Sequence, residues 1–271
     1  MDKDLDSIAE EFLQVSSHLR LGILLYLQEK YYNLSSLSKK LDTTASEMHR
    51  NLKRLSEDNL ILKNSDGLYQ LTSYGKMVCA QVSSWEFMIK NSEYFTKHEF
   101  GTLPALFLRS IGSLNNSKHV KGFVNVQDVW KKILSNSNEY VHNILFEVSY
   151  DAEILSILTT QLKKGVTFSS IFLEDAILPE SRSKVIGNKE ILKAIKDQTL
   201  IRRTIKDITT LVVLNETEAF VMFPKLDGEI DVGEGFYSND NKFHHWCIEY
   251  FDYCMKFSGS FYEEKLKKHQ S

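Results

Sequence analysis

The stretch Thr44-Ala45-Ser46-Glu47-Met48-His49-Arg50-Asn51-Leu52-Lys53-Arg54-Leu55 decides the fold of the first hundred residues. It opens with the pattern Ser/Thr-x-x-Glu, which is typical of a helix start. There the Thr44 hydroxyl and the Glu47 carboxylate would each satisfy an exposed backbone N–H group. The stretch therefore predicts a well-capped helix that begins after Thr44.

This predicted helix has two chemically different faces, because successive residues of a helix advance by about 100°. The polar and cationic face carries Ser46, His49, Arg50 and Lys53. The opposite face carries Met48, Leu52 and Leu55. An apolar back docks on neighbouring helices while the basic front stays available to a partner.

The flanking segments predict a compact helical unit with a hairpin. Residues 5–29 have apolar positions at steps of three or four, which suits one or two helices, and residues 34–41 form a third short one. After the capped helix, residues 60–63 and 68–71 are apolar runs separated by Asp66-Gly67, which favours a β-hairpin. The order of helix, turn, helix and hairpin predicts a winged helix-turn-helix.

A long helix is expected to follow, capped by Thr72 and running to about Tyr94. Its apolar stripe is predicted to pair with a second copy of the chain, although the C-terminal half could also form that contact. The stripe comprises Met77, Val78, Val82, Trp85, Met88 and Ile89. The expected domains are residues 1–95, a winged-helix domain with a dimerising helix, and residues 96–271.

The second half has the pattern of an α/β domain. Candidate strands lie at residues 120–124, 142–148, 166–173, 200–205, 209–214 and 219–223. Helices are expected at 105–114, 126–134, 151–164 and 244 to about 268, with Gly165 capping the third of these. Strand, helix, glycine and strand in that order predict a right-handed βαβ crossover. The fold class is therefore two-domain, α+β with α/β: a winged helix-turn-helix followed by an α/β sensor-like domain.

Composition places the chain among folded cytoplasmic proteins. Its 271 residues are 42% hydrophobic and 25% charged, which disfavours disorder. Three cysteines without close spacing indicate free thiols in a reducing compartment. The longest apolar stretch, residues 21–27, is too short for a membrane span, and the acidic start does not suit a signal peptide. We expect a cytoplasmic protein with no membrane partner.

Charge patterning favours double-stranded DNA as the partner of the capped helix. The net charge of the chain is −3, yet residues 30–76 carry eight Lys or Arg against five Asp or Glu. Arg50 is the best candidate for a base contact, because its planar fork matches guanine O6 and N7. Lys53, Arg54 and Lys63 would contact phosphates, and Lys39 or Lys40 could join them. The predicted DNA-binding residues are Thr44, Ser46, His49, Arg50, Lys53, Arg54 and Lys63. The alternative is a solvated charged face with no ligand.

The chain resembles archaeal winged-helix transcriptional regulators of the ArsR-like kind whose C-terminal half is the methanogenesis regulatory protein middle domain. Four segments carry the resemblance in the first half, at residues 17–20, 34–41, 48–55 and 68–75. In the second half it rests on residues 95–100, Leu103-Pro104, residues 108–114 and Lys164-Gly165-Val166. The resemblance implies a dimeric, sequence-specific DNA-binding protein whose C-terminal domain takes a small effector or an interaction partner.

Other groups of residues are weaker candidates for a functional site. His119-Val120-Lys121 is similar to the His-x-Lys motif of phospholipase D, but Val126 stands where the motif has aspartate. His244, His245, Cys247 and Cys254 are soft-metal ligand types, yet the two cysteines lie among aromatic residues where buried thiols are common. The aromatic set of the last helix, Trp246, Tyr250, Tyr253, Phe257 and Phe261 with Phe236-Tyr237, is expected in the core more often than in a ligand cage. Arg202 and Arg203 are neighbours on one predicted strand, so at least one of them should face the covered side or the edge of the sheet. A solvent-facing arginine is expected over an anion site.

Two functions from other classes remain as alternatives. A methyltransferase-like enzyme would use the winged helix only for dimerisation, but it needs a glycine-rich loop after the first α/β strand. Asn125 and Ser149 follow the candidate strands instead, and Gly233-Glu234-Gly235 lies too late in the chain. A protein-interaction module would use the hairpin to contact another protein. We therefore expect no catalytic residue, no cofactor and no bound metal.

Overall fold

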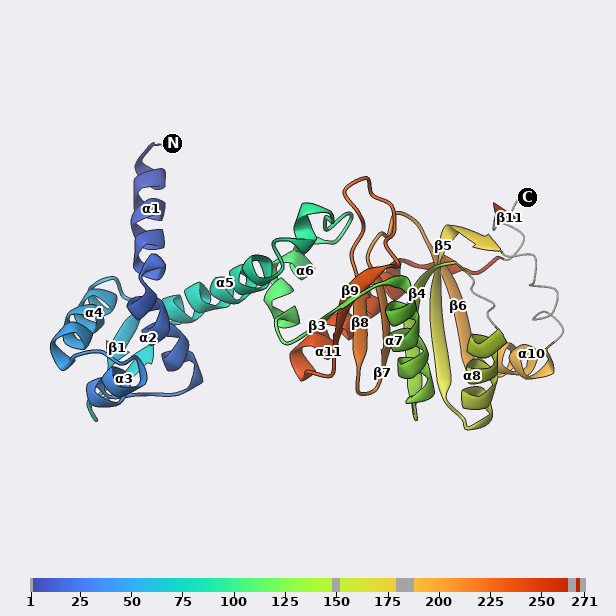
Figure 1. Cartoon of the computed structure of the whole chain (residues 1–271), viewed down its shortest axis with the longest axis horizontal. Helices are drawn as coiled ribbons and strands as arrows, with labels where there is room; N and C mark the ends of the chain where they lie inside the picture. The colour runs from blue at the N-terminus through green and yellow to red at the C-terminus, as the bar shows by residue number, and fades with distance from the viewer. Residues whose placement is uncertain (1, 148–151, 179–187, 263–266, 269–271) are drawn as a thin grey trace. The chain divides into compact units, whose positions relative to one another are not determined.

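The protein is described here by a computed structural model, which covers residues 2–147, 152–178, 188–262 and 267–268. It divides into two compact units, Met1–Trp85 and Glu86–Ser271 (Figure 1). This division falls before residue 95, where the sequence placed its domain boundary, because Phe87 and Tyr94 are buried in the core of the second unit. Among the described residues, no helix combines the length and apolarity needed to cross a membrane.

The first unit contains the helices and hairpin expected from the sequence. Its elements are α1 (Asp2–Ser16), α2 (His18–Glu29), α3 (Leu34–Lys40), α4 (Ala45–Glu57), β1 (Ile61–Lys63), β2 (Tyr69–Leu71) and the start of α5 (Ser73–Lys90). β1 and β2 pair antiparallel, and Tyr32 forms an isolated bridge with Tyr69 that adds a third segment to the hairpin. Gly67 turns the hairpin with a φ of 79°, a conformation that glycine adopts without strain.

One detail of the predicted helix cap is wrong. The Thr44 hydroxyl accepts a hydrogen bond from the Glu47 backbone N–H at 3.2 Å, as expected. The Glu47 carboxylate, however, accepts from the Thr43 hydroxyl at 2.9 Å rather than from backbone. The neighbouring hydroxyl therefore takes the place of the backbone donor in the capping box.

The long helix α5 is shorter than predicted, and its expected stripe is divided between surface and core. Thr72 caps it, since its hydroxyl accepts from the Gly75 N–H at 2.9 Å. The helix ends at Lys90, and the chain continues into a short 3-10 helix, η1 (Tyr94–Thr96). Met77 and Ile89 are 68% and 74% exposed. Val82 of the same stripe is buried, and together with Cys79 and Phe87 it forms the buried side of α5.

The second unit is built on a mixed sheet. Its first part comprises α6 (Ala105–Arg109), η2 (Ile111–Leu114), β3 (Lys118–Lys121), α7 (Phe123–Ser135), β4 (Tyr140–Glu147), α8 (Ala152–Lys163) and β5 (Thr167–Leu178). The remainder comprises α10 (Lys189–Lys196), β6 (Leu200–Ile205), β7 (Leu211–Asn215), β8 (Ala219–Met222), β9 (Glu234–Ser238), α11 (Asn241–Phe257), β10 (Gly259–Ser260) and β11 (Lys267–Lys268). The main strand order is β10-β6-β5-β4-β7-β8-β9-β3, and β11 pairs with β5.

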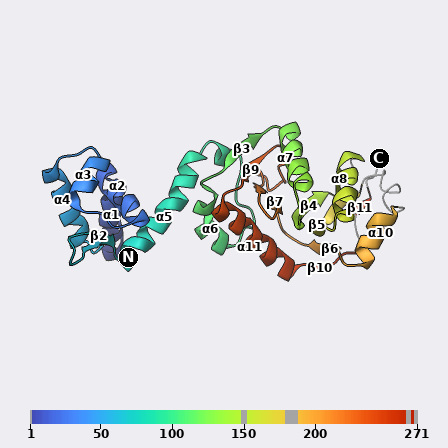
Figure 2. The ribbon, with the colours of Figure 1, turned by 90° about the horizontal axis from the view of Figure 1, so that it is seen from below.

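The predicted βαβ crossover is confirmed by β4, α8 and β5, because β4 and β5 run parallel. β6 continues the parallel part, whereas β7, β8, β9 and β3 follow in antiparallel pairs. Helices α7 and α8 lie on one side of the sheet and α11 on the other (Figure 2). Alternation along β4 agrees with these layers, since His142 stacks on Phe251 of α11 while Asn143 faces the opposite layer.

Several expected bounds in this unit are wrong. β3 ends at Lys121, and α7 begins at Phe123, because Gly122 leaves the strand with a φ of 93°. The predicted helix 105–114 breaks into α6 and η2. The last helix ends at Phe257 rather than near residue 268, and Gly259 begins a strand. The expected ends at residues 148 and 151, and the stretch 263–266, lie outside the described residues.

The elements of this unit that were not predicted include α10, β9 and the short strands β10 and β11. The first residues of β9 were considered only as a glycine-rich segment that lies too late in the chain for a cofactor loop. A Cβ atom on Gly235 would lie 2.6 Å from the Phe220 ring and 2.7 Å from the Val221 carbonyl oxygen. The glycine there allows β8 and β9 to approach closely.

Candidate functional site

The cationic helix α4 is held by its apolar face. Met48, Leu52 and Leu55 are each at most 1% exposed and pack in the core of the first unit with residues of α2 and α3. Burial of three such side chains contributes roughly 1.5–3 kcal/mol each relative to exposure. The orientation of α4 is therefore fixed by the side chains that the sequence assigned to its back.

All seven predicted site residues are exposed, which agrees with the predicted orientation. Six lie at the start and along the outer face of α4, and one lies on β1. They are Thr44, Ser46, His49, Arg50, Lys53, Arg54 and Lys63. Exposure leaves these side chains accessible to a ligand but does not test whether they bind one.

The charges on this surface have few strong internal partners among the described contacts. Lys53 Nζ lies 3.7 Å from Glu57 Oε1, and both side chains are more than 60% exposed. Such a pair is worth little in water and is readily exchanged for another anion. Lys63 Nζ lies 5.5 Å from the Tyr69 ring centroid, which positions the cation along the hairpin.

Two further cations, Lys40 and Arg20, lie outside the predicted set of seven residues. Lys40 Nζ lies 4.9 Å from the Tyr26 ring centroid and 5.5 Å from that of Tyr32. Arg20 on α2 donates from Nη2 to the Leu13 carbonyl at 2.8 Å. Burial, and then the nearby Arg54 guanidinium, lower the pKa of Arg20, whereas Asp58 opposes them. Arg20 comes near Arg54 only through the packing of α2 against α4. Its place beside this surface could therefore not be predicted from the spacing of residues within α4.

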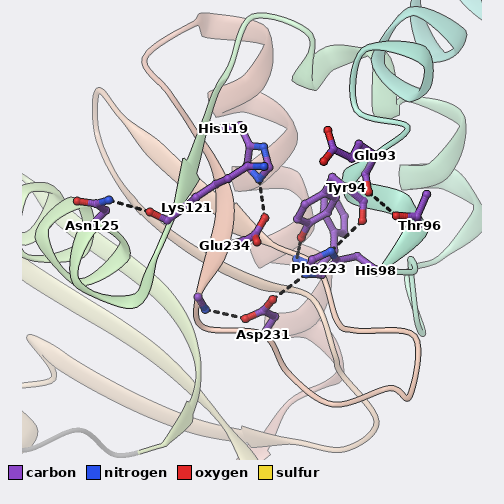
Figure 3. A network of polar contacts seen from close by, with 11 residues as sticks. Glu93, Tyr94, Thr96, His98, His119, Lys121, Asn125, Phe223, Asp231 and Glu234 are labelled. Carbon is purple, nitrogen blue, oxygen red and sulfur yellow. Dashed lines mark hydrogen bonds and ion pairs between the residues drawn. The ribbon is translucent and has the colours of Figure 1, made fainter.

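The His-x-Lys segment of β3 lies in a different polar network, drawn in Figure 3. His119 Nε2 is 3.1 Å from Glu234 Oε2, and the His119 ring stacks on Phe236 with centroids 5.0 Å apart. Burial, followed by the Lys121 charge, lowers the pKa of His119, and Glu234 counteracts the shift. Val126, at the position of the motif's aspartate, is buried in the core.

A second imidazole–carboxylate pair lies beside the first in Figure 3. His98 Nε2 lies 2.7 Å from Asp231 Oδ2, and its Nδ1 lies 2.9 Å from the Tyr94 carbonyl oxygen. The Tyr94 ring stacks on the His98 ring and meets the His119 ring edge-on. These contacts join the segment after α5 to β3 and to the loop before β9.

The candidate metal ligands of α11 are not brought together. Cys247 and Cys254 are fully buried, and burial raises the pKa of both thiols, that of Cys254 to about 12. His244 Nε2 lies 2.6 Å from the Asn215 carbonyl oxygen, while the exposed His245 pairs with Glu249. No group of three metal-ligating side chains occurs among the residues that the structure describes.

The aromatic residues of the last segment divide between core and surface. Trp246 and Tyr250 are 1% exposed, as a core role predicts, whereas Phe257 is 67% exposed because it ends the helix. Arg203 is exposed, as expected. Arg202 is half-buried and lies 4.5 Å from the Phe261 ring centroid, so one arginine of the pair faces the covered side of the sheet, as expected.

Comparison with known proteins finds a family model that matches part of this chain. Residues 12–89 match the family described as methanogenesis regulatory protein FilR1, N-terminal domain. This match covers α2, α3, α4 and the hairpin completely, nearly all of α5, and the C-terminal third of α1. No curated protein matches the chain in sequence.

Solved structures give only distant similarity. TrmBL2, an archaeal chromatin protein, is 11% identical over 91% of this chain and 97% of its own, with a TM-score of 0.40. NucT from Helicobacter pylori is 10% identical over 54% of this chain and 100% of its own, with a TM-score of 0.38. The riboflavin-analogue dimethyltransferase RosA from Streptomyces davawensis is 8% identical over 75% of this chain and 65% of its own, with a TM-score of 0.26.

Proposed function

We propose that the protein is a dimeric transcriptional regulator that binds double-stranded DNA through a winged helix-turn-helix in its first unit. The observation that carries this proposal is the exposed basic face of α4, opposite a face that is almost fully buried. A helix of this kind can enter the major groove while its back remains docked on the domain. The match of residues 12–89 to a regulatory-protein domain supports the same function.

The proposed contacts divide by chemistry. Arg50 reads a base edge, helped by Ser46 and His49 on the same exposed face. The phosphate contacts fix the register of the helix on the duplex. They come from Lys53, Arg54 and Lys63, with Thr44 at the start of α4. Lys40, positioned over two tyrosine rings, adds a further phosphate contact.

A second copy of the chain is proposed to cover the apolar surface shared by α1 and α5. Phe12 stacks on Trp85 with centroids 5.1 Å apart, yet both side chains remain at least 39% exposed. A groove of about 450 Å³ lies there. Leu13 and Met77, which also lie on these helices, are more than 60% exposed. A twofold axis would present two copies of α4 to half-sites about 34 Å apart.

The second unit is proposed to act as the sensor of this cytoplasmic regulator. A small effector bound there would change affinity for DNA only by binding more tightly to one arrangement of the dimer than to another. Whether the output is repression or activation follows from the position of the operator, which this chain does not encode.

The test is the salt dependence of binding to a labelled duplex, measured by fluorescence anisotropy with the full chain. Each lost phosphate contact lowers the slope of log K against log salt by about 0.9. We expect the double change Lys53→Ala with Arg54→Ala to reduce this slope. The matched change Lys193→Ala with Lys196→Ala, on the exposed side of α10, should leave it unchanged. Equal slopes for both variants, or no duplex binding by the unmodified chain, would reject the proposal.

A further inference from the structure

We infer that a cavity in the second unit binds a small neutral molecule with an apolar body and one hydroxyl group. The cavity has a volume of about 100 Å³ and lies between the helices α7, α8 and α10 and the parallel strands β4, β5 and β6. Most of its wall consists of aliphatic and aromatic side chains. It is separate from the network of Figure 3, none of whose labelled residues line it.

A row of polar side chains crosses the floor of this cavity. Asn143 of β4 is in register with Ser170 of β5, and Ser170 is in register with Arg202 of β6. All three residues line the cavity, so the row lies on the sheet face beneath the helices. Asn143 is 4% exposed and Ser170 6% exposed. The fold thus brings polar groups into a layer that is otherwise apolar.

Two groups on the wall have unused hydrogen-bonding capacity. Asn143 Oδ1 is a buried acceptor without a donor, and Trp130 Nε1 is a buried donor without an acceptor. Buried polar atoms are almost always paired in folded proteins, so two such atoms around one cavity require an explanation. A hydroxyl group donates one hydrogen bond and accepts others, so it has the chemistry that each of these atoms lacks in a partner.

The volume sets the size of the ligand. An apolar cavity of about 150 Å³ is large enough for benzene, so about 100 Å³ admits roughly four to six non-hydrogen atoms. A carboxylate of this size fits less well, because it brings a charge into an apolar cavity and has no proton to donate to Asn143. Arg202 lies at the end of the row with its guanidinium over the Phe261 ring.

A ligand in this cavity can also affect the packing of helix α7. Trp130 and Leu145 also line a second cavity of about 100 Å³ beneath α7. A ligand that holds the Trp130 indole would therefore fix the packing of α7 on both sides of that side chain. The effect of such a ligand on DNA affinity rests on the proposed function, whereas occupancy of the cavity does not.

Isobutanol and its isomer methyl isopropyl ether test the inference by isothermal titration calorimetry on the full chain. The two probes contain the same atoms, but the ether cannot donate a hydrogen bond. We expect isobutanol to bind about tenfold more tightly than the ether, the factor expected for one buried hydrogen bond. Asn143→Leu, which removes the acceptor at similar volume, should abolish that preference.

Two further variants keep the result interpretable if Asn143→Leu fails to fold. Trp130→Phe removes the indole donor and should weaken isobutanol binding several-fold. Thr210→Val removes another buried, unpartnered oxygen that does not line the cavity, so it should bind like the unmodified chain. The inference is overturned if isobutanol does not bind, if isobutyrate binds more tightly, or if the preference survives Asn143→Leu. Loss of duplex binding with intact isobutanol binding would reject only the proposed function.

Discussion

Replacing Gly75 with alanine should open the first unit, although alanine is the better helix former. Gly75 lies in the first turn of α5, where an added Cβ atom would be 2.0 Å from the Leu60 carbonyl oxygen. That carbonyl is already held, because it accepts from the Thr72 N–H at 3.1 Å and from the Thr72 hydroxyl at 3.2 Å. The end of α4, the hairpin and α5 meet at this point, so the backbone cannot move aside independently.

The expected decrease in the free energy of unfolding of the first unit is the difference between two opposing effects. Alanine gains about 1 kcal/mol over glycine in a helix interior. Overpacking against a fixed neighbour costs about 3 kcal/mol, the upper part of the usual range, because the overlap is with backbone. The net loss of about 2 kcal/mol raises the equilibrium constant for opening roughly 30-fold. Gly22→Ala is the matched control, since its Cβ would meet only the Leu41 side chain, whose Cδ2 atom at 2.6 Å is a side-chain end that can rotate.

Alkylation of Cys79 reports opening of the first unit. Cys79 is 1% exposed, and burial raises the pKa of its thiol to about 11, so it reacts only when the unit opens. Peptide mass spectrometry separates its labelling from that of Cys247 in the second unit. We expect about 30-fold faster labelling of Cys79 in Gly75→Ala, with Cys247 unchanged. The reasoning is refuted if Gly75→Ala labels Cys79 no faster than Gly22→Ala does.

Three further predictions concern recognition and the second core. Arg50→Ala should lower affinity for a selected duplex by about 1–3 kcal/mol and relax preference at one base position, measured by competition among sequences recovered from random DNA. Burial lowers the pKa of His142 in the folded chain. As pH falls below about 6.5, the imidazole is therefore protonated in the unfolded chain before it is protonated in the folded chain, and the free energy of unfolding decreases. His142→Phe should reduce the loss of the urea midpoint between pH 7 and pH 5, whereas the exposed His245→Phe should not. Glu218→Gln should destabilise the fold by about 1–3 kcal/mol in urea, because the buried Glu218 carboxylate accepts from both the Tyr237 hydroxyl and the Asn136 amide, and glutamine turns an NH2 group toward one of these donors. A midpoint equal to that of the unmodified chain would contradict this.

The first unit was predictable because its signals are local. The Thr44 cap, the apolar back of α4 and the Asp66-Gly67 turn each act over a few residues, and they agree with one another. Tertiary contacts were not predictable in the same way. The approach of Arg20 to Arg54, and the position of Lys40 over Tyr26, depend on how separate helices pack.

The second unit shows where local signals fail. Gly235 breaks the apolar pattern of β9 because it accommodates the close approach of β8, so the strand resembles a loop in sequence. The row from Asn143 to Arg202 depends on the register of three parallel strands separated by helices. Spacing within a single segment does not determine that register, so the cavity was not visible in the sequence.

Photo-crosslinking tests most directly whether the outer face of α4 lies on DNA. A photoreactive amino acid replaces His49 in one sample and Lys193 of α10 in another, and each full chain is irradiated with the same labelled duplex. Both positions are exposed, so accessibility alone does not distinguish them. We predict a crosslink to the duplex from position 49 that competitor DNA removes, and none from position 193. Crosslinking from position 193 with none from position 49 would contradict the account.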